Sequence, residues 1–522
     1  MIARKAWTAG GPALAAGFGA ALAHPPFGLL PGLAGYALLM ALLDRADAQR
    51  PLRSAFLRAW LAGLAYFAVG VWWVAEAFMV DPAQAWMAPF AVVLLAAGLA
   101  LFWGLGGLLY RRFAPGGPSR VVVFAGVFTA AEWLRGHVLT GLPWNLPGET
   151  FRAGSAVSQG ASVFGAYGMT WLVLAMAASL ATVREGRRGR AAVAIAAAAL
   201  AGLFGYGAVR LDAAAPAAPD APVVRIVQAD IKQSAKYDAA LFNEIVARYL
   251  RLTPSPGGRP ADLVIWPEGA IPAAFDDYLA PGAWTRRAIA EAVAPGQTLL
   301  VGGFREERGR YYNSLLALRG PRLDVVARYD KFRLVPFGEY LPLEPLWERF
   351  GLKQMVHVGD GFSSGPPPAP AVLGAGLPVI QPLICYESLF PGFTRQGAAR
   401  SGHRASLIVN ISNDAWFGVT SGPWQHLNLA SYRAIEEGLP MVRATPTGIS
   451  AIVDAYGRSD PGRRLGLGRQ GAIEARAPPA LPPTPYARFG DAALALLLAL
   501  SALTAIRLDG RRRLSDTARP SA

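Results

Sequence analysis

QPLICYESLF, residues 381–390, contains the only cysteine among the 522 residues of the chain. The residues before it form a short apolar run typical of a buried strand, and the pair Tyr386-Glu387 follows it. A lone thiol forms no internal disulfide, so it serves packing, metal binding or chemistry. By itself, a cysteine at the end of an apolar strand is most often a small buried hydrophobic residue.

Two other apolar segments end in the same way. Glu268 follows LVIWP, and Lys331 follows VVARYD. Catalytic groups in α/β folds tend to lie just beyond strand ends, where rigid backbone meets open surface. A thiol needs a nearby base or cation to become a nucleophile, and Glu268 could accept its proton. Lys331 and the backbone N–H of Tyr386 could stabilise the negative oxygen of acyl transfer to Cys385.

Strand-like and helix-like segments alternate between residues 222 and 478, which predicts an α/β domain of stacked sheets and helices. The predicted strands lie at 223–231, 261–269, 298–304, the first part of 323–339, 382–388, 406–414 and 441–448. The predicted helices lie at 237–252, 284–294 and 424–438.

The rest of the chain has the composition of a membrane protein. Hydrophobic residues make up 53% of the whole and charged residues only 16%, against about 25% charged in ordinary soluble domains. Runs of the length that a bilayer requires occur near 8–28, 30–44, 55–79, 86–110, 120–137, 160–183, 191–209 and 488–507. We therefore predict a membrane domain of about seven helices in residues 1–210, a transmembrane helix at 488–507 and a cytoplasmic tail at 508–522.

The net charge of +15 comes largely from arginine clusters that flank these spans. That placement indicates the positive-inside rule and argues against nucleic-acid binding. Counting arginine and lysine on each side places the N-terminus inside and the 222–478 domain outside. A rival reading of the first segment is a signal peptide with a cleavage site after residues 21–23, which would leave the same domain outside.

Four motifs in order resemble one known family: WPEGA (266–270), YDKFRLVPFGEYLP (329–342), ICYES (384–388) and NISNDAWFG (410–418). The set is similar to the Glu-Lys-Cys triad of the nitrilase superfamily. Within it, long forms with spans on both sides are apolipoprotein N-acyltransferases. The resemblance continues through residues 422–458 and includes LPWNLPG (142–148), so it covers nearly the whole chain.

The resemblance implies an αββα sandwich on the periplasmic side of the bacterial inner membrane. A phospholipid would acylate Cys385, and the acyl chain would pass from the thioester to the α-amine of a diacylglyceryl-cysteine at the N-terminus of an apolipoprotein. It implies that Glu268 is the base, that Lys331 stabilises the oxyanion and that Glu339 supports the triad. Tyr386, Glu387, Trp416 and Tyr237 match further supporting or substrate-binding positions. No cofactor or metal is implied, and we expect a monomer.

The chain departs from the family pattern at two positions. Tyr237 stands where the family usually has tryptophan, which keeps an aromatic face but changes possible lipid contacts. Pro446 stands in RATPTG (443–448), where the family usually has asparagine or a similar residue, and removes a backbone donor there. The stretch 340–358 mixes large apolar residues with a few charges, so we predict an arm that enters the lipid headgroup region. The alternative is a loop folded back on the sandwich.

Two alternatives stay open on sequence alone. A membrane-tethered amidase or nitrilase would hydrolyse a small C–N substrate with the same triad, although soluble amidases need no spans. A lipid-binding scaffold or transporter would need ionisable residues within its spans, for which Glu76 and Glu132 are the best candidates. The joint presence of Glu268, Lys331 and Cys385 favours an enzyme over both a scaffold and a transporter.

Overall fold

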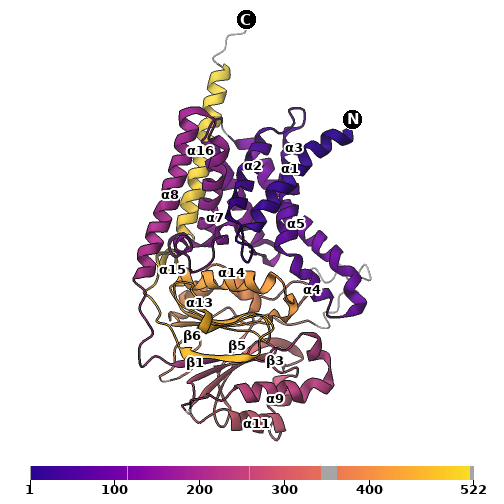
Figure 1. The fold of residues 1–522 in the computed structure, drawn as a ribbon, viewed down its shortest axis with the longest axis vertical. Helices are drawn as coiled ribbons and strands as arrows, with labels where there is room; N and C mark the ends of the chain where they lie inside the picture. The colour runs from indigo at the N-terminus through magenta and orange to yellow at the C-terminus, as the bar shows by residue number, and fades with distance from the viewer. Residues whose placement is uncertain (1, 115, 258, 343–360, 375, 518–522) are drawn as a thin grey trace. The chain divides into compact units, whose positions relative to one another are not determined.

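The computed structural model describes all residues except 1, 115, 258, 343–360, 375 and 518–522, and it describes no side chains for 2–9 and 507–517. Most of the predicted arm at 340–358 lies outside the described residues. The chain folds into two compact units (Figure 1). The helical unit comprises Met1–Ala214 and Pro483–Ala522, and the α/β unit comprises Ala215–Pro482.

The helical unit is built from long apolar helices joined by short helical turns. Its helices are α1 (Ile2–Leu22), α2 (Ala34–Asp44), α3 (Pro51–Gly70), α4 (Ala75–Phe78), α5 (Ala88–Phe113), α6 (Arg120–Arg135), α7 (Ala161–Ser179), α8 (Gly186–Asp212), α15 (Pro485–Phe489) and α16 (Ala492–Thr517).

Within the described residues, four helical segments are long and apolar enough to cross a membrane. They are Pro51–Gly70, Pro82–Phe113, Val157–Thr182 and Gly186–Asp212. Shorter apolar helices occur at Gly10–Leu22, Leu30–Asp44 and Ala492–Ile506. The sequence-based count of seven spans before residue 210 stays a prediction.

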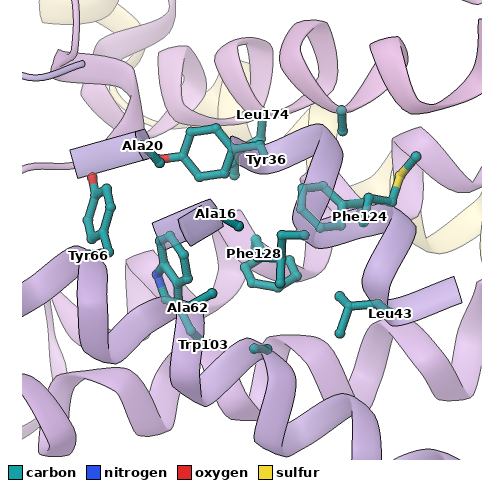
Figure 2. Packing of buried hydrophobic residues seen from close by; sticks show 14 of the residues in the cluster. Ala16, Ala20, Tyr36, Leu43, Ala62, Tyr66, Trp103, Phe124, Phe128 and Leu174 are labelled. Carbon is teal, nitrogen blue, oxygen red and sulfur yellow. The ribbon is translucent and has the colours of Figure 1, made fainter. Parts of the chain in front are cut away.

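Close packing of α1, α3 and α5 depends on small residues and surrounds one aromatic cluster. A Cβ added to Gly17 would lie 1.8 Å from the carbonyl oxygen of Ala62, so only glycine permits this approach of α1 to α3. Next to this contact, Trp103 lies 4.7 Å from Tyr66 and 5.8 Å from Phe128, measured between ring centroids. Figure 2 shows these rings with the small residues of the cluster.

Glu132, a candidate for the transporter alternative, is held in a buried ion pair. It accepts a hydrogen bond from Trp103 Nε1 at 2.5 Å, and Arg135 Nε donates to its other oxygen at 2.9 Å. Arg135 also donates to the carbonyl oxygen of Leu142. The carboxylate therefore braces α6 against α5 and the following loop.

The α/β unit contains two sheets. The six-stranded sheet has the order β11-β1-β2-β3-β4-β5 and the five-stranded sheet the order β10-β9-β8-β7-β6. The strands are β1 (Val223–Gln228), β2 (Leu263–Ile265), β3 (Thr298–Glu307), β4 (Arg310–Arg319), β5 (Asp324–Asp330), β6 (Ile380–Ile384), β7 (Leu407–Ile411), β8 (Met441–Ala444), β9 (Ser450–Val453), β10 (Arg464–Leu465) and β11 (Gly471–Arg476). Strands β1, β2 and β3 are parallel neighbours in the six-stranded sheet, and β6, β7 and β8 are parallel neighbours in the five-stranded sheet, where β6 is an edge strand.

Helices cover the outer faces of the two sheets, which gives the αββα sandwich that the sequence predicted (Figure 1). Apolar side chains of α9 (Phe242–Leu252) and α11 (Trp284–Ala292) pack on the six-stranded sheet. On the five-stranded side lie α13 (Phe393–Ser401) and α14 (Gly422–Glu437). A second core, made of residues from both sheets, fills the space between them. Because both faces of the parallel strands are covered, these strands are mostly apolar and fix the loops beyond their ends.

Candidate active site

Three charged side chains meet beyond the strand ends of the α/β unit. Lys331 directly follows β5, Glu268 lies in the loop after β2, and Glu339 lies in the loop after Lys331. Lys331 Nζ donates a hydrogen bond to Glu339 Oε1 at 2.9 Å and lies 3.6 Å from Glu268 Oε1. All three residues are buried. Burial alone would lower the pKa of Lys331, but Glu339 and Glu268 raise it above its usual value, so the lysine stays an ammonium.

Asn313, on β4, joins the two carboxylates. Its Nδ2 donates to Glu268 Oε1 at 2.6 Å and to Glu339 Oε1 at 2.9 Å. Glu339 Oε2 accepts the backbone N–H of Val335 at 2.8 Å. Glu268 Oε2, in contrast, is buried and has no hydrogen-bond partner among the described residues. One oxygen of Glu268 is therefore held by the protein, and the other is available to accept a proton.

The backbone of Cys385 has an unusual conformation. Its φ of 49° lies in the left-handed region, which costs a non-glycine residue about 1–3 kcal/mol and occurs often at active sites. Ser388 Oγ donates to the Cys385 carbonyl oxygen at 2.8 Å, and His426 Nε2 lies 3.3 Å from the same oxygen. These two contacts hold the turn that begins at Cys385 in its left-handed conformation at the end of β6.

The Cys385 thiol is not ionised at neutral pH. The residue keeps some exposed surface, but protein atoms enclose most of it. Burial raises the pKa of the thiol to about 12, and the negative charge of Glu268 adds to this increase. Lys331 and the hydroxyl of Ser412 act in the opposite direction. A neutral thiol next to a carboxylate needs that carboxylate as a base before it can attack.

A buried network of polar side chains supports the turn that begins at Cys385. Asp414 Oδ1 lies 3.0 Å from His426 Nδ1, and both Asp414 oxygens accept from Arg443 Nη2 at 2.8 Å. Burial alone would raise the pKa of Asp414, but Arg443 and His426 lower it to about 2. Ser412 Oγ, whose hydroxyl also contacts the thiol, donates to Asp414 Oδ1 at 2.8 Å. This network connects β7, β8 and α14 to Cys385.

Glu387 uses both of its oxygens within the protein. Oε2 accepts the backbone N–H of Ile384 at 2.8 Å, and Oε1 accepts from Tyr329 Oη and from the backbone N–H of Phe332, each at 2.8 Å. Burial raises the pKa of Glu387 to about 7 even though these hydrogen bonds oppose the increase. Glu387 therefore links the residue before Cys385 to the residue after Lys331.

The remaining predicted positions differ in how deeply they are buried. Tyr386 is buried against the ring of Phe390. Trp416 is half-buried, and Tyr237 is largely exposed and accepts a hydrogen bond from Gln233 Nε2 at 3.3 Å. In the described part of the chain, neither Trp416 nor Tyr237 makes a hydrogen bond or ion pair with Glu268, Lys331 or Cys385.

Pro446 takes part in a contact through its carbonyl group. It lacks an N–H, but its oxygen accepts the backbone N–H of Ile231 at 3.1 Å. Beside it, Thr447 Oγ1 donates to Asp230 Oδ1 at 2.8 Å. The turn with the family departure is thus bonded to the loop that follows β1.

Sequence reasoning missed Asn313 because β4 was not recognised as a strand. The signal was present in RYYNSLLALR, where aromatic and aliphatic residues surround a single amide that must find a partner when buried. Among the residues that the structure describes, no group of three or more His, Cys, Asp or Glu side chains has the arrangement of a metal site.

Residues 223–459, most of the α/β unit, match the family model described as carbon-nitrogen hydrolase. Among solved structures, an amidase from Nesterenkonia is 20% identical, with a TM-score of 0.35, over 54% of this chain and 98% of its own. Residues 16–179 match the model described as the apolipoprotein N-acyltransferase N-terminal domain.

Relatives of similar length match both units together. The apolipoprotein N-acyltransferase of Caulobacter vibrioides is 57% identical over 512 residues, which cover 97% of this chain and 95% of the relative. That of Bradyrhizobium diazoefficiens is 40% identical and covers 97% and 96%. The chain therefore belongs to the apolipoprotein N-acyltransferase family and is an acyltransferase enzyme. With its apolar helices, it is a multi-pass bacterial membrane protein, and the amidase and transporter alternatives are not favoured.

Proposed function

We propose that Cys385 carries an acyl chain from a phospholipid to the N-terminal α-amine of a diacylglyceryl apolipoprotein. Membership of the family makes the chain a lipoprotein N-acyltransferase. The proposal adds the donor, the covalent carrier and the role of each side chain. The observation that carries it is the buried carboxylate of Glu268, which acts on the Cys385 thiol and keeps one oxygen unpaired among the described residues.

In the first half-reaction, Glu268 Oε2 accepts the thiol proton while sulfur attacks the ester carbonyl carbon of the phospholipid. The Lys331 ammonium stabilises the developing oxyanion, together with the backbone N–H of Tyr386. The C–O bond then breaks, and the glycerol oxygen takes the proton from Glu268. A lysophospholipid leaves, and the acyl chain stays on Cys385 as a thioester.

In the second half-reaction, the lipoprotein α-amine attacks the thioester carbonyl carbon. Glu268 accepts a proton from the attacking nitrogen, the C–S bond breaks, and the sulfur takes that proton back. The product is an amide, and the enzyme returns to its starting state. The same carboxylate serves both steps, which follows from the symmetry of acyl transfer through a covalent intermediate.

The supporting residues act on the position of these groups. Glu339 and Asn313 hold Lys331 and Glu268 at fixed separation, since Asn313 bonds both carboxylates. Glu387 fixes the nucleophile turn against the Lys331 loop. We assign Trp416 and Tyr237, which keep exposed aromatic surface, to substrate binding.

We further propose that the enzyme works as a monomer in the inner membrane, with seven spans before residue 210 and one near 488–507. The α/β unit then lies on the periplasmic side, where lipoproteins with a free N-terminus would meet it. The distribution of arginine between spans supports this orientation.

The test is a transfer assay with purified full-length enzyme, a diacyl phospholipid and a synthetic diacylglyceryl-cysteine peptide. We expect the peptide to gain the mass of one acyl chain, stable to hydroxylamine because it is an amide. An N-acetylated peptide is the matched control and should gain nothing. Acylation of the acetylated peptide, or full activity in Glu268→Gln, would contradict the proposal.

A further inference from the structure

A second lysine, Lys236, lies close to Glu268 from the opposite loop. It belongs to the short helical turn Ser234–Tyr237 that follows β1, whereas Lys331 follows β5. Lys236 Nζ is so close to the backbone after Glu268 that a Cβ on Gly269 would lie 3.3 Å from it. The position of Gly269, at φ 57°, thus leaves room for an ammonium beside the base.

The ammonium of Lys236 is buried and has no hydrogen-bond partner within the described residues. Its stem is partly exposed, but the nitrogen itself is enclosed. Burial lowers the pKa of Lys236 to about 8, although the charge of Glu268 acts to raise it. A buried, unpaired cation is costly, and such groups persist where a ligand supplies the missing anion.

The surroundings hold this lysine in place. Gln233, in the same segment, accepts a hydrogen bond from Asn413 Nδ2 at 2.9 Å, beyond the end of β7. Ile231, earlier in the loop, is bonded to Pro446. The loop that carries Lys236 is therefore tied to the five-stranded sheet on the side where Cys385 lies.

We propose that Lys236 Nζ binds the phosphodiester of the phospholipid donor. This inference rests on the proposed function, in which Glu268 protonates the leaving glycerol oxygen. The glycerol backbone places its phosphate only a few bonds from that oxygen. Lys236 Nζ lies close to the backbone after Glu268 but makes no hydrogen bond with Glu268, so an anionic group a few bonds from the leaving oxygen can reach the ammonium. The two lysines thus have different roles: Lys331 stabilises the oxyanion of the reacting carbonyl, and Lys236 binds the phosphodiester of the headgroup.

The experiment compares two acyl donors that form the same thioester on Cys385. Phosphatidylglycerol carries the phosphodiester, and p-nitrophenyl palmitate has none. Intact-mass spectrometry follows thioester formation on the full-length enzyme, and Lys236→Met is compared with Lys236→Arg. Lys232→Met is the matched control, because Lys232 is an exposed lysine of the same segment.

We expect Lys236→Met to slow acylation by phosphatidylglycerol about 10- to 100-fold, the value of one charge-assisted hydrogen bond. Acylation by p-nitrophenyl palmitate should stay within about twofold, which also shows that the variant is folded. Lys236→Arg should keep most of the phospholipid rate, and Lys232→Met all of it.

Equal losses with both donors would assign Lys236 to general catalysis or folding and would overturn the inference, as would no loss with either. Failure of the proposed function gives a different result. The wild-type enzyme would then form the thioester from p-nitrophenyl palmitate but not from any phospholipid, and no phosphodiester would be there for Lys236 to bind.

Discussion

The protonation state of Cys385 gives the sharpest prediction. A thiol of pKa about 12 is ionised in only about one molecule in 10⁴ at pH 8, whereas a thiol of the ordinary value 9.0 is ionised in about one in ten. The folded site should thus hold about a thousandfold less thiolate than an unfolded chain at the same pH. The physical cause is burial together with the charge of Glu268.

Iodoacetamide alkylation measures this directly, since the chain has a single cysteine and gives a single adduct mass. The logarithm of the alkylation rate should rise with a slope of about one per pH unit from pH 6 to pH 10 in the folded enzyme. In urea the rate should level off near pH 9. The slope is compared rather than the absolute rate, because burial also slows access of the reagent.

The variant Glu268→Gln separates charge from burial. Removing the carboxylate should move the inflection to lower pH and speed alkylation, while acyl transfer is lost because the base is gone. A plateau below pH 8 in the wild-type enzyme would mean a preformed thiolate paired with Lys331. That result would refute the role of Glu268 as the base that activates a neutral thiol.

Three further predictions concern Asn313, Asp414 and the membrane topology of the chain. Asn313→Leu removes one donor shared by two buried carboxylates and should slow thioester formation about 10- to 100-fold; an unchanged rate would separate Asn313 from the site. Asp414→Asn leaves Arg443 without its buried partner and should cost about 3–5 kcal/mol of unfolding free energy, seen as a lower thermal midpoint. Because the pKa of Asp414 is lowered to about 2, its contribution is full above pH 4 and is lost as the pH falls toward 2, so the variant should lose this acid dependence. Lys232→Cys in a Cys385→Ala background should react with an impermeant maleimide in spheroplasts but not in sealed inside-out vesicles; the reverse pattern would invert the proposed topology.

Much of the site was predictable because the sequence carries it in short, ordered motifs. Glu268, Lys331 and Cys385 each follow an apolar strand, and strand ends are where a sheet presents catalytic groups. The alternation of strands and helices predicted stacked layers of sheet and helix, and the family resemblance implied the αββα sandwich. Strand-end position made these residues candidates, and the ordered motifs that resemble the nitrilase superfamily implied their roles.

What could not be predicted depends on contacts between distant segments. The pairing of Asn313 with Glu268 and Glu339 needs the register of β4, a strand whose pattern was not recognised. The left-handed backbone of Cys385 is imposed by partners such as His426, 41 positions away. Likewise, the sequence does not distinguish Lys236 from a surface lysine, because only the fold shows that its nitrogen is enclosed close to Glu268.

Helix boundaries show the same limit in the helical unit. The run predicted at 55–79 overlaps α3, which begins at Pro51 and ends at Gly70. There Trp73 Nε1 donates to the Gly70 carbonyl oxygen at 3.1 Å, and a short helical turn at Trp72–Val74 and α4 follow. Hydropathy continues across this break because the residues stay apolar, so composition alone could not locate it.

The central claim is that Cys385 holds the acyl chain between donor and acceptor. The most direct measurement is the intact mass of the full-length enzyme after incubation with a diacyl phospholipid and no acceptor. We predict a gain of one acyl chain that hydroxylamine removes, that Cys385→Ala never acquires, and that a diacylglyceryl-cysteine peptide discharges with formation of an N-acyl product. An enzyme that transfers acyl chains to the peptide at full rate in Cys385→Ala, or that never carries a hydroxylamine-labile adduct while it turns over, would contradict the account.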